Sequence, residues 1–130
     1  MTDIPGAFMQ ADMDEIVNMQ IEGKVAQLMT KIDPKKYEKY TVMERGQPVI
    51  YVRLLKPIYG THKAALLFWE NLSETLQEWG FNITPYDWCV TNKMINGTQC
   101  TMGWHVDDLK ISHVESEVVD DILNKLDEMY

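Results

Sequence analysis

The sequence predicts an α+β protein in which helices pack against an antiparallel sheet. Two hairpins indicate the sheet: the first turns at Asn96-Gly97, and the second carries the adjacent acids Asp107-Asp108 between apolar and β-branched runs. Two stretches, one ending at Gly80 and one covering 115–130, have apolar residues at three- and four-residue spacing. This spacing indicates amphipathic helices, whose apolar faces need a sheet to cover them. The chain has 130 residues, enough for one domain or a piece of one.

Charge and composition exclude several classes of protein. The formal net charge of -8 and the pI near 4.7 argue against free binding to nucleic acid, because Lys and Arg contacts to phosphate supply most of that affinity. We find no apolar segment long enough to span a bilayer and no signal-peptide pattern at the start, so we expect a soluble intracellular protein without a membrane partner. Cys89 and Cys100 lie in strand-like runs without C-x-x-C spacing, which predicts buried free thiols.

The first half of the chain alternates short elements and turns. A Pro-Gly pair follows Asp3, so the residue types alone make Asp3 a helix cap or turn residue and Phe8 a core ring. Apolar spacing predicts a helix over 24–32 that ends at Asp33-Pro34. A short basic connector with tyrosines follows, and a turn over 45–48 then leads into a strand over 49–54.

The acidic pair at 107–108 calls for a turn. Along a regular strand neighbouring side chains face opposite ways, so a turn is what lets both carboxylates point toward one site. Two carboxylates ~4 Å apart repel by about 1 kcal/mol even in water, so a divalent cation is worth considering as their ligand. Taken alone, Asp-Asp is also an ordinary turn dipeptide.

Four segments together resemble the reverse transcriptases of copia-type long-terminal-repeat retrotransposons. These are D-I-x-x-A-F-M at 3–9, Tyr59-Gly60 before a Trp-bearing helix that ends in Gly80-Phe81, D-x-C-V at 87–90, and x-V-D-D-L at 105–109. The chain departs from the family pattern at six positions. The family usually has Gly, Tyr, Pro, Gln, Pro and Arg where this chain has Ala11, Asn18, Ile21, Lys63, Ala65 and Leu66.

The resemblance implies a polymerase palm, an antiparallel sheet with helices packed on one face. Residues 1–130 would be a partial domain from which the fingers, thumb and RNase H region are absent. It implies that Asp3 and Asp107 bridge two Mg²⁺ ions, or Mn²⁺ in their place, with Asp108 supporting the site. The backbone from Ile4 to Ala7 would lie near the incoming triphosphate. Phe8 would stand under the sugar, where a bulky ring excludes a 2′-hydroxyl. Lys63, in place of the usual Gln, either contacts phosphate or marks a decayed copy.

The activity that follows from the resemblance is RNA-directed DNA polymerisation. The expected partners are an RNA or DNA template with its primer, a deoxynucleoside triphosphate, and the rest of the retrotransposon polyprotein, in a cytoplasmic particle. The alternative is a truncated or decayed remnant that keeps the palm fold without activity, and we expect the isolated chain to be inactive. An unrelated acidic interaction domain would require all four matches to be coincidental. Without a strand before Asp3, we also expect an open sheet edge that favours self-association.

Overall fold

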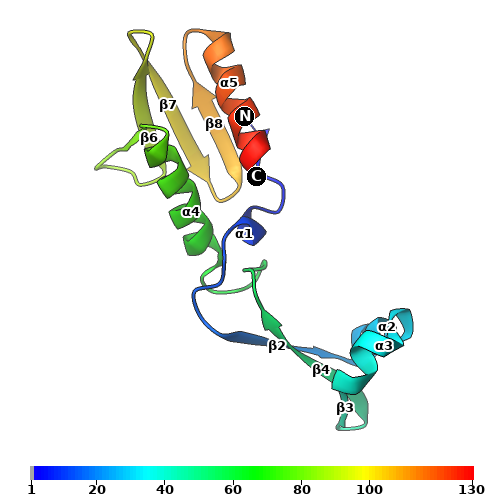
Figure 1. The fold of residues 1–130 in the computed structure, drawn as a ribbon. Helices are drawn as coiled ribbons and strands as arrows, with labels where there is room; N and C mark the ends of the chain where they lie inside the picture. Colours follow the sequence, from blue (N-terminus) through cyan, green and yellow to red (C-terminus); the bar gives the residue numbers. More distant parts are fainter. Residues whose placement is uncertain (1) are drawn as a thin grey trace. The chain divides into compact units, whose positions relative to one another are not determined.

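The computed structural model describes residues 2–130 as an α+β protein with antiparallel sheets, in agreement with the predicted fold class (Figure 1). The described chain forms two compact units. Unit 1 comprises residues 2–12 and 56–130, and unit 2 comprises residues 13–55. The sequence predicted a single partial domain and gave no signal for this division. No helix among the described residues has the length and apolar character needed to cross a membrane.

Unit 1 is built on a five-stranded antiparallel sheet with the strand order β1-β8-β7-β6-β5. Both predicted hairpins are present, and β6 and β7 join at Asn96-Gly97 as predicted. The second turn was predicted one residue too late: β7 and β8 join at Val106-Asp107, and Asp108 already pairs with His105 in the ladder. The strands are β1 (Thr2–Asp3), β5 (Asn82–Ile83), β6 (Val90–Ile95), β7 (Thr98–His105) and β8 (Asp108–Ser112).

Two long helices, α4 (Ala64–Glu78) and α5 (Ser116–Met129), lie over one face of this sheet, and the short helix α1 (Ala7–Gln10) lies near its lower end in the view of Figure 1. The alternation of side chains along the strands turns apolar residues toward these helices. Burial of each large apolar side chain contributes about 1.5–3 kcal/mol, so this pattern fixes which face the helices cover. The shared core includes Met102, Trp104, Leu109, Phe68, Leu72, Leu76, Ile122 and Leu126.

Helix α4 ends as the sequence predicts, at a glycine cap. Gly80 has φ +83°, its N–H donates to the carbonyl of Gln77, and Phe81 N–H donates to the carbonyl of Leu76. The ammonium of Lys93 donates to the carbonyl oxygen of Trp79 at 2.6 Å. A cation at the negative end of the helix dipole stabilises that end.

Unit 2 is a three-stranded antiparallel sheet, in the order β2-β4-β3, with short helices. The predicted helix over 24–32 is confirmed and stops at Asp33, whose carboxylate accepts from Lys36 N–H at 3.2 Å. The predicted turn over 45–48 is shorter than expected, since Gln47 and Pro48 already pair in β4. The elements are β2 (Val17–Glu22), α2 (Gly23–Ile32), α3 (Pro34–Tyr37), the 3₁₀ helix η1 (Glu38–Tyr40), β3 (Thr41–Glu44) and β4 (Gln47–Leu54).

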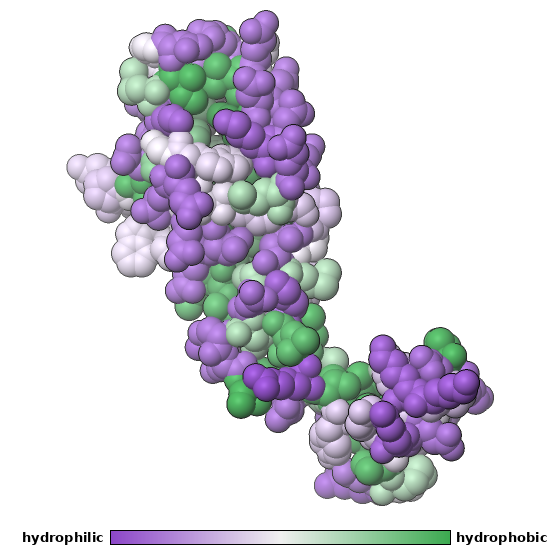
Figure 2. Space-filling model, in the orientation of Figure 1, coloured by the Kyte–Doolittle hydropathy of each residue, from purple (hydrophilic) through white to green (hydrophobic). Residues whose placement is uncertain are grey.

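The two units differ in charge. Seven of the chain's twelve Lys and Arg residues lie in unit 2, with six of its twenty acidic residues, so unit 2 is slightly positive and unit 1 carries the negative charge. Helix α2 also leaves Val25, Leu28 and Ile32 exposed, while Ala26 is buried. On the face drawn in Figure 2, hydrophobic residues are scattered among hydrophilic ones. Unit 1 is therefore the acidic part of the chain that disfavours binding to nucleic acid, and unit 2 is not acidic.

Candidate functional site at the acidic hairpin

The turn between β7 and β8 holds an unusual backbone conformation. It has two residues, Val106 and Asp107, and is closed by the pairing of His105 with Asp108. Val106 has φ +57° and Asp107 has a negative φ, which is the pattern of a type II′ turn. Glycine normally fills the first position of such a turn, and a β-branched residue there is strained by roughly 1–3 kcal/mol. The chain keeps this strain next to the acidic pair.

Asp3 joins the hairpin through the main chain. Strand β1 runs antiparallel to β8, with Asp3 directly opposite Asp108 and Thr2 opposite Leu109. The next residue, Ile4, donates its N–H to the carbonyl of Asp107 at 3.1 Å. Directly opposed residues face the same side of a sheet, so Asp3 and Asp108 share the side opposite the buried Leu109. Asp3 is therefore linked through a few backbone contacts to the adjacent acids Asp107 and Asp108, which lie more than 100 residues later in the sequence.

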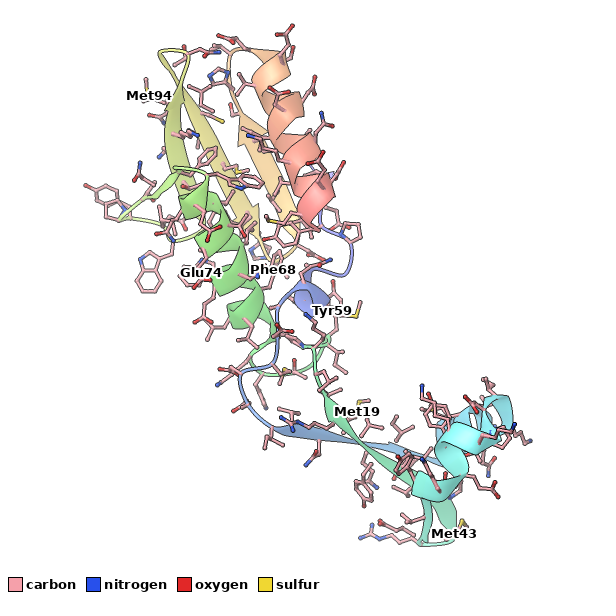
Figure 3. All side chains as sticks on the ribbon, viewed as in Figure 1. Met19, Met43, Tyr59, Phe68, Glu74 and Met94 are labelled. Atoms are coloured by element: carbon pink, nitrogen blue, oxygen red, sulfur yellow. The ribbon has the colours of Figure 1, made fainter. Side chains whose placement is uncertain are left out.

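Tyr59 contacts this group from outside the sheet. Its hydroxyl donates to Oδ2 of Asp107 at 2.9 Å, and its ring lies beside α1 with its centroid 4.4 Å from that of Phe8 (Figure 3). The pKa of Tyr59 is raised, first by the hydrogen bond to Asp107, then by burial, and then by the charges of Asp107 and Asp3. The charges of Asp3 and Asp107 thus act on the same hydroxyl group. No local sequence pattern pointed to a role for Tyr59, because its partner Asp107 lies 48 residues away in the chain.

The residues expected near a nucleotide are mostly buried. Ile4 is 3% exposed, Ala7 0% and Phe8 7%. The Phe8 ring packs between Tyr59 and Phe68, whose ring centroid is 6.4 Å away. The main-chain N–H groups of Ile4 and Ala7 are also engaged, because Ile4 donates to the carbonyl of Asp107 and Ala7 donates to the carbonyl of Ile4 at 3.2 Å. The core role that the residue type alone predicts for Phe8 is present, together with its contact to Tyr59.

Lys63 stands at the start of α4, four residues after Tyr59. Thr61 orders the loop between them, because both its N–H and its hydroxyl donate to the carbonyl of Ile58, at 3.1 and 2.8 Å. Gly60 supplies the positive φ of +94° that the loop requires. A helix N-terminus with a lysine beside it favours anionic groups such as phosphate. The loop therefore runs from the acidic hairpin to a position suited to an anion.

A cavity of about 690 Å³ lies on the side of the sheet that carries Asp108. Its lining includes Asp108 and His105 from the hairpin and Lys110 further along β8. The sequence did not predict this cavity. Cys89, which also lines it, was expected in a strand but lies in the turn before β6, because the Asp87 carboxylate accepts Cys89 N–H at 2.9 Å. The thiol is free and partly buried, as predicted.

Within residues 2–130, no group of three or more His, Cys, Asp or Glu side chains is arranged to hold a metal ion. The site instead contains Asp3 and Asp107, whose negative charges both raise the pKa of Tyr59. Asp108 lies opposite Asp3 in the strand pair. Mg²⁺ is usually held by one or two carboxylates together with substrate phosphates and water. The carboxylates supply oxygen donors of the kind that Mg²⁺ prefers, and the described side chains do not form an all-protein cage.

Comparisons with protein-family models, with curated protein sequences and with solved structures find no match to this chain. The fold and the site define the protein as an α+β chain with antiparallel sheets and an acidic hairpin beside a short edge strand.

Proposed function

We propose that this chain is the palm of an RNA-directed DNA polymerase from a copia-type retrotransposon. The observation that carries the proposal is the pairing of Asp3 with Asp108. The sequence resemblance makes a specific spatial demand, namely that the acid near the start of the chain lies beside the acidic hairpin. Local sequence patterns contain no information about that contact, so its presence supports the proposal independently of the motifs.

In this proposal the chain's own groups bind and orient the reactants. Asp3 and Asp107 hold Mg²⁺ together with the triphosphate, and Asp108 supports them. Mg²⁺ held there would supply activation of the primer 3′-hydroxyl and charge neutralisation at the departing pyrophosphate. The backbone of Ile4 to Ala7 lies along the triphosphate, and Phe8 supports the sugar. Lys63 and the N-terminus of α4 attract phosphate. Catalysis of this kind depends mainly on positioning and on charge neutralisation.

A second candidate is a remnant that keeps the fold without doing chemistry. One observation favours it: the described residues do not assemble a three-ligand metal group. Lys63, which stands where the family usually has Gln, also favours the remnant. The two candidates differ in whether nucleotides are incorporated, and this difference can be measured directly.

The test is primer extension on an RNA template with Mg²⁺ and deoxynucleoside triphosphates. It compares this chain with the protein expressed from the whole reading frame around it, each with an Asp107→Asn variant. The matched control is Glu74→Gln, which removes one acidic charge from α4 (Figure 3). We expect Asp107→Asn to lower incorporation by at least 100-fold and Glu74→Gln to leave it unchanged. Unchanged activity in Asp107→Asn would overturn the proposal, and no activity in either wild-type protein would support the remnant.

A further inference from the structure

We propose that Tyr59 is a positioning residue for Asp107. Its hydroxyl fixes the orientation of the carboxylate, and its ring ties that orientation to Phe8. This inference rests on the proposed function, because it assigns to Tyr59 the task of preparing Asp107 for a cation. It adds to the site a residue whose role no local sequence pattern indicates.

The position of the Tyr59 hydroxyl is set by the core. Tyr59 is 61% exposed, and a side chain this exposed would be mobile without specific contacts. The ring, however, packs against the Phe8 ring, with the two ring centroids 4.4 Å apart and the ring planes tilted by 50°. Phe8 itself is buried and contacts Phe68 of α4 edge-on. Packing of the tyrosine ring on these aromatic side chains therefore fixes where its hydroxyl meets the turn.

Asp107 is held at two points. Its carbonyl accepts Ile4 N–H at 3.1 Å, and its Oδ2 accepts the Tyr59 hydroxyl at 2.9 Å. Of the acids Asp3, Asp107 and Asp108, Asp107 is the one whose side chain accepts a hydrogen bond from another residue in the described part of the chain. A turn residue would otherwise sample several rotamers, and ordering it on binding would cost free energy. The hydrogen bond removes much of that cost in advance.

The hydrogen bond leaves room for a cation. An ionised carboxylate offers about four lone-pair directions, and Tyr59 uses one of them on Oδ2. Oδ1 and the second direction on Oδ2 remain available. Removal of a group that hydrogen-bonds a metal ligand typically lowers metal affinity by about 10- to 100-fold. Because Asp107 is only partly buried, we expect the lower end of that range.

A matched control exists in unit 2. The hydroxyl of Tyr51 donates to both carboxylate oxygens of Glu44, at 2.9 and 3.0 Å. The geometry is the same in kind as that between Tyr59 and Asp107, and the side chain is likewise exposed, at 52%. Tyr51→Phe therefore removes an equivalent hydrogen bond in unit 2 and leaves the acidic hairpin unchanged.

The experiment measures Mn²⁺ binding to the whole chain by electron paramagnetic resonance, which detects the free ion, and so it does not depend on polymerase activity. The variants are Tyr59→Phe, Tyr51→Phe and Asp107→Asn, each checked by its thermal melting temperature. Tyr59→Phe keeps the ring on Phe8 and removes the hydroxyl alone. We expect the Mn²⁺ dissociation constant to rise about tenfold in Tyr59→Phe and to stay unchanged in Tyr51→Phe.

The outcomes separate this inference from the proposed function. One outcome would overturn the positioning role and leave the proposed function standing. In it, Asp107→Asn abolishes Mn²⁺ binding, but Tyr59→Phe binds Mn²⁺ as tightly as the wild type or more tightly. Wild-type binding that survives in Asp107→Asn, or no binding by the wild-type chain either alone or with a deoxynucleoside triphosphate present, would overturn the cation site and the positioning role with it. A tenfold loss in Tyr59→Phe without a change in melting temperature would support the role, because a merely structural contact would not alter cation affinity alone.

Discussion

Asp3 and Asp108 lie directly opposite each other in the β1–β8 pair, so two like charges share one side of the sheet. Opposed residues have Cβ atoms roughly 4.5–5.5 Å apart, and like charges in this arrangement destabilise the pair. We expect Asp108→Asn to raise the free energy of unfolding by about 0.5 kcal/mol. Urea denaturation at low ionic strength measures the change.

Urea denaturation at high salt tests whether repulsion between Asp3 and Asp108 is the cause of the change. Screening weakens repulsion between exposed charges, so the gain from Asp108→Asn should shrink as salt is added. Glu74→Gln also removes one negative charge from unit 1, but Glu74 lies on α4 and has no acid opposite it in a strand pair. A loss of stability in Asp108→Asn, or an equal gain in Glu74→Gln, would contradict the explanation.

The turn at Val106 should become more stable with glycine. Val106 has φ +57°, a region that costs an L-residue roughly 1–2 kcal/mol, whereas glycine enters it freely. Part of the gain is offset by the greater freedom of glycine in the unfolded chain. We expect Val106→Gly to raise the free energy of unfolding by about 0.5–1 kcal/mol, measured by urea denaturation.

Asn96 provides the comparison for Val106. It has φ +51° in the β6–β7 turn, but asparagine tolerates this region better than valine. Asn96→Gly should therefore change stability less than Val106→Gly does. Equal effects of the two substitutions would show that strain at Val106 is not the source of the gain.

Two threonines of the sheet should respond in opposite directions to replacement by valine. Thr91 is fully buried, and its hydroxyl has no hydrogen-bond partner among residues 2–130. An unpaired buried hydroxyl is costly, so Thr91→Val should raise the free energy of unfolding by about 1 kcal/mol. Thr101 instead donates to Asn92 at 2.7 Å, and Thr101→Val should lower the free energy of unfolding. Destabilisation by Thr91→Val in a thermal melt would contradict the first expectation.

The two cysteines should react slowly with a thiol reagent, and the rate should rise with pH. Burial raises the pKa of Cys100, partly offset by Lys93, and burial followed by the charge of Asp87 raises the pKa of Cys89. A raised pKa favours the neutral thiol in the fold. This contribution to stability is present below the ordinary thiol pKa and is lost as the pH rises through the raised value. At pH 8 each thiol is therefore less ionised than a free one.

Reaction with Ellman's reagent checks this in single-cysteine variants. With Cys89→Ser, the remaining Cys100 is fully buried and should react only when urea unfolds the chain. With Cys100→Ser, the partly exposed Cys89 should react slowly at pH 8 and faster above pH 9. Fast reaction of Cys100 in the native chain at pH 8 would contradict its burial.

The sequence predicted the elements whose signals are local. The turn at Asn96-Gly97, the glycine cap at Gly80 and the stop of α2 at Asp33 each depend on a few neighbouring residues. Cys89 was misplaced because a run of apolar residues looked like a strand, while the hydrogen bond from Cys89 N–H to Asp87 favoured a turn.

Contacts between residues far apart in the chain could not be predicted from local sequence patterns. The β2–β4 pairing joins Val17 to Leu54, and no local pattern specifies which strand pairs with which. The hydrogen bond between Tyr59 and Asp107 is of the same kind. The acidic residues of the site were identified through the resemblance to a family, whereas the residue that orients one of them was not.

Strand β1 has two residues, and both of its pairings are with β8. So short an edge strand opens locally at little free-energy cost. Each opening carries Asp3 away from Asp107 and Asp108. At the proposed cation site, the expected affinity is then the intrinsic affinity multiplied by the fraction of molecules in which the strand is closed. Any contact that lengthens this strand would strengthen the proposed cation binding without touching a ligand.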